Sequence, residues 1–136
     1  MNIDRFKENH VQILDSIATL RRHAHAGIAE NAERIAELIV SMSAVIKVHL
    51  AAEDRVIYPA IEASTDARLA ELGRRFQEEM VAIAAEYNGF ARQWNTAARL
   101  RADPERFRAQ ANVVLRALYE RMQREDRDFY PAVEGS

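Results

Sequence analysis

Five polar residues interrupt apolar stripes that should face a protein core. They are His10, His49, Glu53, Glu79 and Glu125. Burial of an isolated carboxylate is costly, so such groups are paired, protonated or bound to a metal. His49 and Glu53 are four residues apart and therefore lie on one helix face. Imidazoles and carboxylates together suit iron, manganese or zinc. The set predicts a buried metal site.

Counting residues from the expected helix turns places these five groups at one depth. If the first two helices turn near residue 29, His10 lies 19 residues before the turn and His49 lies 20 after it. If the last two helices turn near residue 102, Glu79 and Glu125 each lie 23 residues from that turn. We therefore expect their side chains to converge.

An internal repeat supports this alignment. Residues 53–60 match residues 125–132 at six of eight positions, 72 residues apart, so Glu53 is level with Glu125. A simpler interpretation is that the motif only ends a helix, with Pro stopping it and Tyr packing at the rim. That interpretation explains the Tyr-Pro pair but not two glutamates on apolar stripes.

The elements that must position these residues are helices. Apolar residues recur every three or four positions, and the chain has only 4 Gly and 3 Pro in 136 residues. Gly27 is a helix stop, while Asp66 and the Asp103-Pro104 pair are helix starts. These signals predict helices near 3–27, 31–58, 66–100 and 104–129, with a kink or break open at Asn88-Gly89. An all-α, antiparallel up-down-up-down four-helix bundle follows, as a single domain over 1–136. Coiled-coil oligomers are the alternative, but the stripes are wider than a strict coiled-coil seam.

Composition excludes several classes of protein. There is no Cys, which removes disulfides, thiolate zinc sites and iron–sulfur clusters. The net charge of -2 gives no basic footprint for nucleic acid. No apolar run approaches a membrane span and the start is no signal peptide, so we expect a cytoplasmic protein without a membrane partner. His23 and His25 are expected at the surface.

The chain resembles the hemerythrin-like domain, also called the HHE cation-binding domain, over essentially its whole length. The residues that carry the resemblance are His10, the His49-x-x-x-Glu53-Asp54 run ending in Tyr58-Pro59, and the Glu125-Asp126 run ending in Tyr130-Pro131. The resemblance implies a four-helix bundle around a non-haem di-iron centre. It further implies that His10 and His49 are terminal ligands of one iron, and that Glu53 and Glu125 bridge. Members of the family bind dioxygen or other small molecules, store iron, or sense oxygen and iron.

Two positions depart from this family pattern. The family has one or two histidines on the third helix, where Glu79 is the best-placed residue here. It also has a histidine four or five residues before the carboxylate of the fourth helix, and the repeat makes Arg121 the equivalent of His49. Arginine has only donors and stays protonated, so it is no ligand. The charges of three ionised glutamates are balanced by one divalent ion together with Arg121. This balance favours a mononuclear site; a metal-free cluster is the second alternative and a di-iron centre is the third.

The leading hypothesis is a hemerythrin-like protein that holds iron, with zinc or manganese as substitutes, and a small diatomic ligand such as O2 or NO. The alternative is a bundle that has lost its metal and serves as an interaction or structural module. An enzyme that consumes peroxide or NO is a third hypothesis. We expect Arg121 to bond at least one of Glu53, Glu79 and Glu125; the alternative is that its side chain extends along Leu118 into water.

Overall fold

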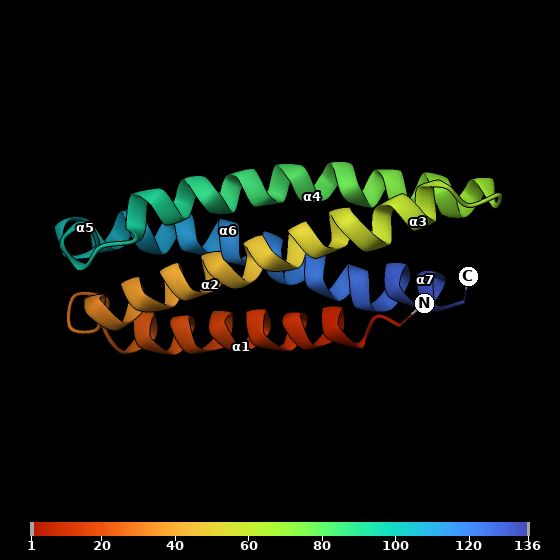
Figure 1. Cartoon of the computed structure of the whole chain (residues 1–136). Helices are drawn as coiled ribbons and strands as arrows, with labels where there is room; N and C mark the ends of the chain where they lie inside the picture. The colour runs from red at the N-terminus through yellow and green to blue at the C-terminus, as the bar shows by residue number, and fades with distance from the viewer. Residues whose placement is uncertain (1, 136) are drawn as a thin grey trace.

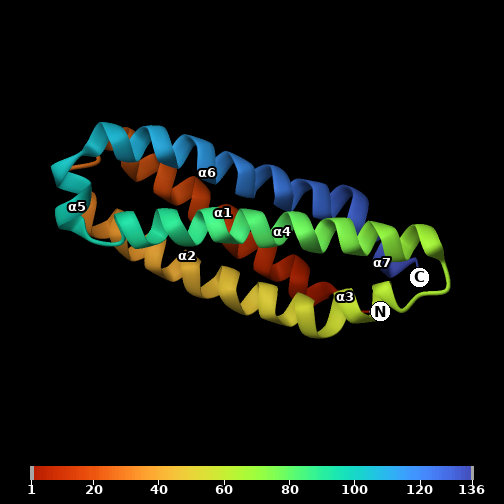
Figure 2. The same cartoon turned by 90° about the horizontal axis from the view of Figure 1, so that it is seen from above.

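Four long helices make up most of the chain in the computed structural model, which describes residues 2–135. They are α1 (Asp4–Ala26), α2 (Ala32–Ala52), α4 (Ala67–Trp94) and α6 (Pro104–Arg124). Each lies along its neighbours in both views (Figures 1 and 2), with α1 against α2 and α6, and α4 against α2 and α6. There is no strand within the described residues. The prediction of an all-helical bundle is confirmed.

Five shorter helical segments accompany the long ones, so the count differs from the predicted four. The α2 helix continues into η1 (Glu53–Ile57) and α3 (Tyr58–Glu62), and α6 continues into η2 (Glu125–Phe129) and α7 (Tyr130–Glu134). The predicted third helix is divided, because α5 (Ala97–Ala102) begins afresh after Thr96, whose hydroxyl caps it by accepting from the Arg99 N–H. The α4 helix runs unbroken through Asn88 and Gly89.

The two repeated segments form π-helical turns, in which the chain is wound more widely than in an α-helix. The Tyr58 N–H donates to the carbonyl of Glu53, and the Tyr130 N–H donates to that of Glu125. Each tyrosine precedes a proline, whose ring clashes with a carbonyl four residues earlier in a regular α-helix. The wider turn accommodates the proline without ending the helix. The sequence repeat is therefore also a structural repeat, with a glutamate at the start of each turn.

The predicted start and stop signals act as expected. The Asp66 carboxylate accepts from the N–H groups of Arg68 and Leu69, which begins α4. The Asp103 carboxylate accepts from the Arg106 N–H, with a proline at the first position of α6. Gly27 ends α1 with φ of 144°, a backbone conformation that favours glycine.

The apolar core consists of two clusters with a polar level between them. The larger cluster includes Ile13, Ile46 and Met122, and the smaller includes Phe6, Ile57 and Phe129. On α1, on the α2–η1 helix and on the α6–η2 helix, the predicted site residues lie between members of the two clusters. Both sides of that level are therefore closed by apolar side chains.

One helical stretch, Ala32–Glu62, is long and apolar enough to cross a membrane, with a mean hydropathy of 1.7 over its best window. This corrects the expectation that no segment approaches a membrane span. The same length and composition are found in core helices of soluble proteins, so the observation is weak evidence for a membrane. Buried residues of this stretch, such as Ile35 and Ile39, belong to the larger core cluster.

Candidate metal centre

Four of the five predicted site residues lie inside the bundle. His10 comes from α1, His49 from α2, Glu53 from the start of η1 and Glu125 from the start of η2. Each is at most 1% exposed. The prediction that these four residues face inward is confirmed.

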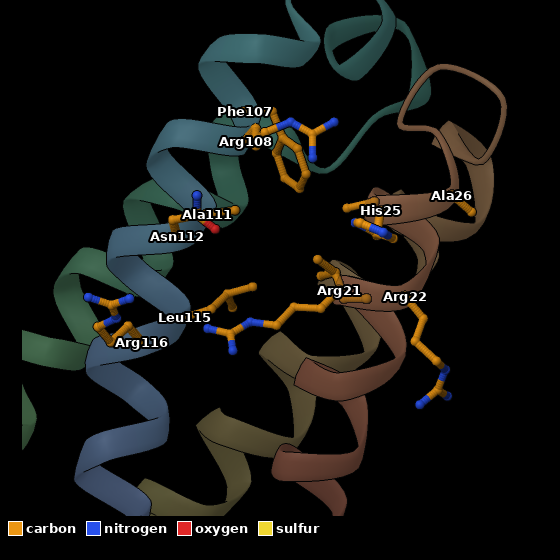
Figure 3. Close-up of a pocket in the computed structure, with 12 residues that line it drawn as sticks. Arg21, Arg22, His25, Ala26, Phe107, Arg108, Ala111, Asn112, Leu115 and Arg116 are labelled. Carbon is orange, nitrogen blue, oxygen red and sulfur yellow. The ribbon is translucent and has the colours of Figure 1, made fainter.

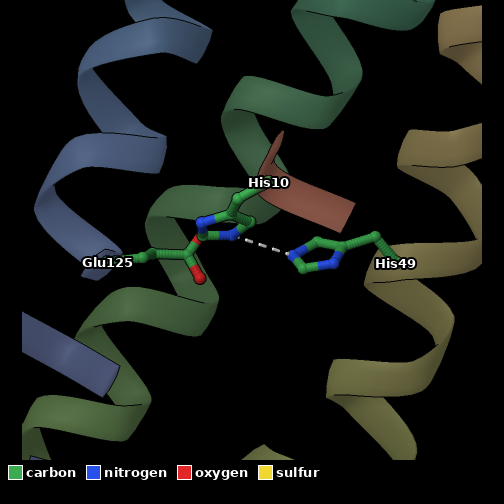
Figure 4. A group of neighbouring side chains, drawn as sticks. All are labelled: His10, His49 and Glu125. Atoms are coloured by element: carbon green, nitrogen blue, oxygen red, sulfur yellow. Dashed lines mark hydrogen bonds and ion pairs between the residues drawn. The ribbon is translucent and has the colours of Figure 1, made fainter. Parts of the chain in front are cut away.

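The two imidazoles and the Glu125 carboxylate meet closely. The Nε2 atoms of His10 and His49 are 3.2 Å apart, as the dashed line in Figure 4 marks. His10 Nε2 lies 3.8 Å from Glu125 Oε1, and His49 Nε2 lies 3.2 Å from Glu53 Oε1. One nitrogen or oxygen atom from each of His10, His49 and Glu125 lies within 4.8 Å of the others. Three ligand atoms this close could hold one ion.

Partners outside the centre orient both histidines. The Nδ1–H of His10 donates to Asp126 Oδ1 at 2.8 Å, and the Nδ1–H of His49 donates to Asn9 Oδ1 at 3.1 Å. Since these oxygens only accept, each imidazole carries its proton on Nδ1 and turns the Nε2 lone pair toward the centre. Burial also lowers the pKa of His10 to about 4, which favours the neutral ring. Metal-binding histidines are held in this way.

Asn9 and Asp126 are functional residues that the sequence reasoning missed. They adjoin His10 and Glu125 in the chain, and adjacent helix positions do not share a face. The only sequence signal was the repeated Glu-Asp pair, since Asp54 and Asp126 occupy equivalent positions.

The two buried carboxylates are incompletely bonded. Among the described residues, Glu53 Oε1 and Glu125 Oε2 have no hydrogen-bond partner. Burial and the neighbouring Glu53 carboxylate raise the pKa of Glu125 to about 8, and burial raises the pKa of Glu53 as well. Buried polar atoms without partners are rare in native proteins and are often satisfied by an ion or water. These two oxygens, beside two imidazole lone pairs, fit a cation.

Tyr130 places a hydroxyl group in the centre. It donates to Glu53 Oε2 at 3.2 Å and lies 3.0 Å from His10 Nε2 and 3.4 Å from His49 Nε2. Tyr58, its equivalent in the repeat, is also buried. The interpretation of both tyrosines as rim residues is therefore wrong. The repeat of the Tyr-Pro pair was the signal that could have identified them.

Arg121 occupies the position that the internal repeat makes equivalent to His49. Its side chain is fully buried, and its Nε donates to Glu125 Oε1 at 3.2 Å. Its Nη1 donates to Glu79 Oε2 at 3.2 Å, and its Nη2 donates to the carbonyl of Phe76 at 2.6 Å and to the hydroxyl of Tyr58 at 3.3 Å. The predicted bond to a glutamate is confirmed, and the alternative in which Arg121 extends into water is wrong.

Glu79 does not join the other four residues, which corrects the prediction of five converging groups. Its side chain is 44% exposed, whereas the next residue, Met80, is 2% exposed. Glu79 accepts from Arg121 and forms an ion pair with Arg124 Nη1 at 3.1 Å, at the edge of the bundle. Most of the predicted buried face of α4 is confirmed, since Phe76, Tyr87, Phe90 and Trp94 are buried, but at this level Met80 is buried in place of Glu79. His25 is exposed and His23 half-buried, near the expected surface position.

These features define a helical bundle with a buried site for a cation. The family model described as "Hemerythrin HHE cation binding domain" matches residues 1–133, and the chain belongs to that family. No curated protein and no solved structure matches the chain.

Proposed function

We propose that this protein binds a single non-haem iron ion through His10, His49, Glu53 and Glu125. One observation carries the proposal: ligand atoms of His10, His49 and Glu125 lie within 4.8 Å of one another inside the bundle, with Glu53 Oε1 3.2 Å from His49 Nε2. Each of the two carboxylates also has one buried oxygen without a hydrogen-bond partner among the described residues. Zinc or manganese would suit the same mixed donors. The short connections between the long helices support the up-down-up-down order of the family.

A second ion is disfavoured by the residue that the internal repeat makes equivalent to His49. The Arg121 guanidinium offers only donors, and it already engages Glu125 Oε1. The nearby position on α4 holds the apolar side chain of Met80, while Glu79 lies at the edge. The buried charges are the two glutamates, Glu53 and Glu125, and Arg121, since Glu79 is at the edge beside Arg124. With both glutamates ionised, one divalent ion leaves a net charge of about +1 in the core, whereas two ions would leave about +3 in a medium of low polarity.

A small diatomic ligand, O2 or NO, is the physiological partner that we propose for this site. Iron, when bound, supplies a centre that such molecules can bind. The Tyr130 hydroxyl lies beside both imidazoles, and it would donate its one proton to such a ligand in place of Glu53 Oε2. Apolar clusters on both sides exclude water. We also propose that the protein acts in the cytoplasm.

The alternative function, a metal-free interaction module, is favoured by the same arginine. Arg121 already compensates part of the buried negative charge, and protonation of one glutamate would compensate the rest. The two functions differ in metal content.

Elemental analysis of protein expressed with added iron, together with its absorption spectrum before and after NO addition, tests the proposal. We expect close to one iron per chain and a new absorption band with NO. Two irons per chain would indicate a di-iron centre. Protein without metal, which also takes up no Fe2+ under anaerobic titration, would favour the interaction module.

A further inference from the structure

A second candidate binding site lies far from the metal centre. A cleft of about 580 Å³ opens between α1 and α6, near the end of the bundle where α5 lies (Figure 3). Small-molecule sites have volumes of about 300–1,000 Å³. Leu20 begins the cleft on α1, ten residues after His10, which is about 15 Å along a helix. The cleft is therefore separate from the proposed iron site.

The inner surface of the cleft is apolar. Leu20, Phe107 and Leu115 form the apolar layer beneath it and are each at most 1% exposed. The accessible apolar surface comes from Ala24, Ala26 and Ala111, which an aliphatic chain could contact on entering. Such apolar contacts contribute to affinity but do not fix the orientation of the ligand.

The mouth of the cleft is positively charged, although the whole chain has a net charge of -2. Four arginines line the cleft, and none of its lining residues is acidic. Arg21 reaches from α1 across the cleft toward Leu115, and Arg108 lies at the mouth opposite His25 (Figure 3). Arg22 and Arg116 point away. Two guanidinium groups, from two helices, thus face one apolar floor.

Within the part of the chain that the structure describes, these donors have few partners. Among residues 2–135, Arg21 and Asn112 form no hydrogen bond or ion pair. Arg108 has only an ion pair with Glu105 at 3.7 Å, between two exposed side chains. Such exposed pairs contribute little to stability and are readily exchanged for another anion. Guanidinium groups bind carboxylates and phosphates in a fork geometry.

We propose that this cleft binds a small organic carboxylate with an apolar body, its carboxylate held by Arg21 and Arg108 and its apolar part against Ala24 and Ala111. The apolar cleft between α4 and α6 provides a contrast, because its only charged lining residue is Glu86. The inference does not depend on the metal or on the proposed function.

Calorimetric titration of the whole protein with octanoate tests this proposal. Octan-1-ol has the apolar part alone, and inorganic phosphate has the anion alone. We expect octanoate to bind more tightly than either. The double variant Arg21→Ala/Arg108→Ala should bind octanoate about tenfold more weakly or worse, since each charge-assisted contact is strong. The matched control is Arg34→Ala/Arg75→Ala, which removes two exposed arginines outside the cleft and should bind as the wild type does.

Two further measurements locate the ligand. The side-chain amide of Asn112 lines the cleft, so its NMR signals should shift with octanoate, while those of Asn88 should not. His49→Ala should leave octanoate binding unchanged, which separates the cleft from carboxylate binding at iron. Absence of octanoate binding, equal binding of octan-1-ol, or undiminished binding by the double arginine variant would overturn the proposal.

Discussion

Arg121 donates from its Nε atom to Oε1 of Glu125 at 3.2 Å, one helical turn along α6, in a fully buried pair. The equivalent pair in the internal repeat is His49 and Glu53, whose Nε2 and Oε1 atoms are also 3.2 Å apart. The two halves of the bundle thus place a guanidinium and an imidazole in the same position. An imidazole can bind a metal, whereas a guanidinium has only donors and carries one positive charge.

Arg121→Ala should destabilise the protein by about 3–5 kcal/mol, because it leaves the buried Glu125 carboxylate without its charged partner. Denaturant unfolding measures this loss. The control Arg106→Ala removes an exposed arginine of the same helix and should cost under about 1 kcal/mol. If the two variants unfold alike and metal content is unchanged, Arg121 does not replace the charge of a metal.

Arg121→His should raise the metal-to-protein ratio, since it restores in α6 the His-x-x-x-Glu spacing of α2. Elemental analysis after iron loading measures the ratio. Arg121→Gln is the matched control, because it removes the charge without adding an imidazole. An equal ratio in both variants would mean that the second half of the core cannot hold an ion, for which the buried Met80 would be the reason.

His49→Ala should lower metal content more than His23→Ala or His25→Ala does. Of these three histidines, only His49 lies in the buried centre, where its Nε2 is 3.2 Å from Glu53 Oε1 and its Nδ1–H donates to Asn9. The three variants are purified in parallel and their iron is measured against protein. Equal iron in all three would contradict the assignment of His49 as a ligand.

Removal of the metal should lower the melting temperature. An ion that binds the folded chain and not the unfolded chain stabilises the fold by linkage, and this contribution is lost with a chelator. The measurement is thermal unfolding of protein known to contain metal, with and without chelator. An unchanged melting temperature would indicate a peripheral ion.

Metal-free protein should lose stability as the pH rises from 6.5 to 8. The pKa of Glu125 is raised from 4.5 to about 8, so the folded state holds a proton there that the unfolded state releases above pH 4.5. Stability therefore falls with pH up to about 8. Burial lowers the pKa of His10 from 6.5 to about 4, which acts in the opposite direction but only below pH 6.5.

Denaturant unfolding at a series of pH values measures this dependence in the chelator-treated protein. Glu125→Gln should remove most of the slope between pH 6.5 and 8, because the amide does not titrate there. If Glu125→Gln keeps the full dependence of stability on pH, a group other than Glu125 is responsible for it.

The sequence by itself determined the four long helices, the starts of α4 and α6, the end of α1, and four members of the centre. Apolar periodicity marks the buried face of each helix, and His10, His49, Glu53 and Glu125 interrupt that face. The repeat aligned the two glutamates and identified Arg121 as the counterpart of His49. All of these are local or periodic properties of the sequence, and they do not depend on which residues are in contact in the folded structure.

Tertiary structure alone decided the rest. Adjacent residues on a helix point about 100° apart, and both Glu79 and Met80 border the buried face of α4, so periodicity alone does not decide which of them faces the core. Packing against the other helices turned Met80 inward and left Glu79 at the edge with Arg121 and Arg124. The hydrogen bonds from His49 to Asn9 and from His10 to Asp126 likewise join different helices. The periodicity of the sequence does not predict either pair. Helix phase and contact between helices depend on the whole core, and for that reason periodicity in one chain does not specify them.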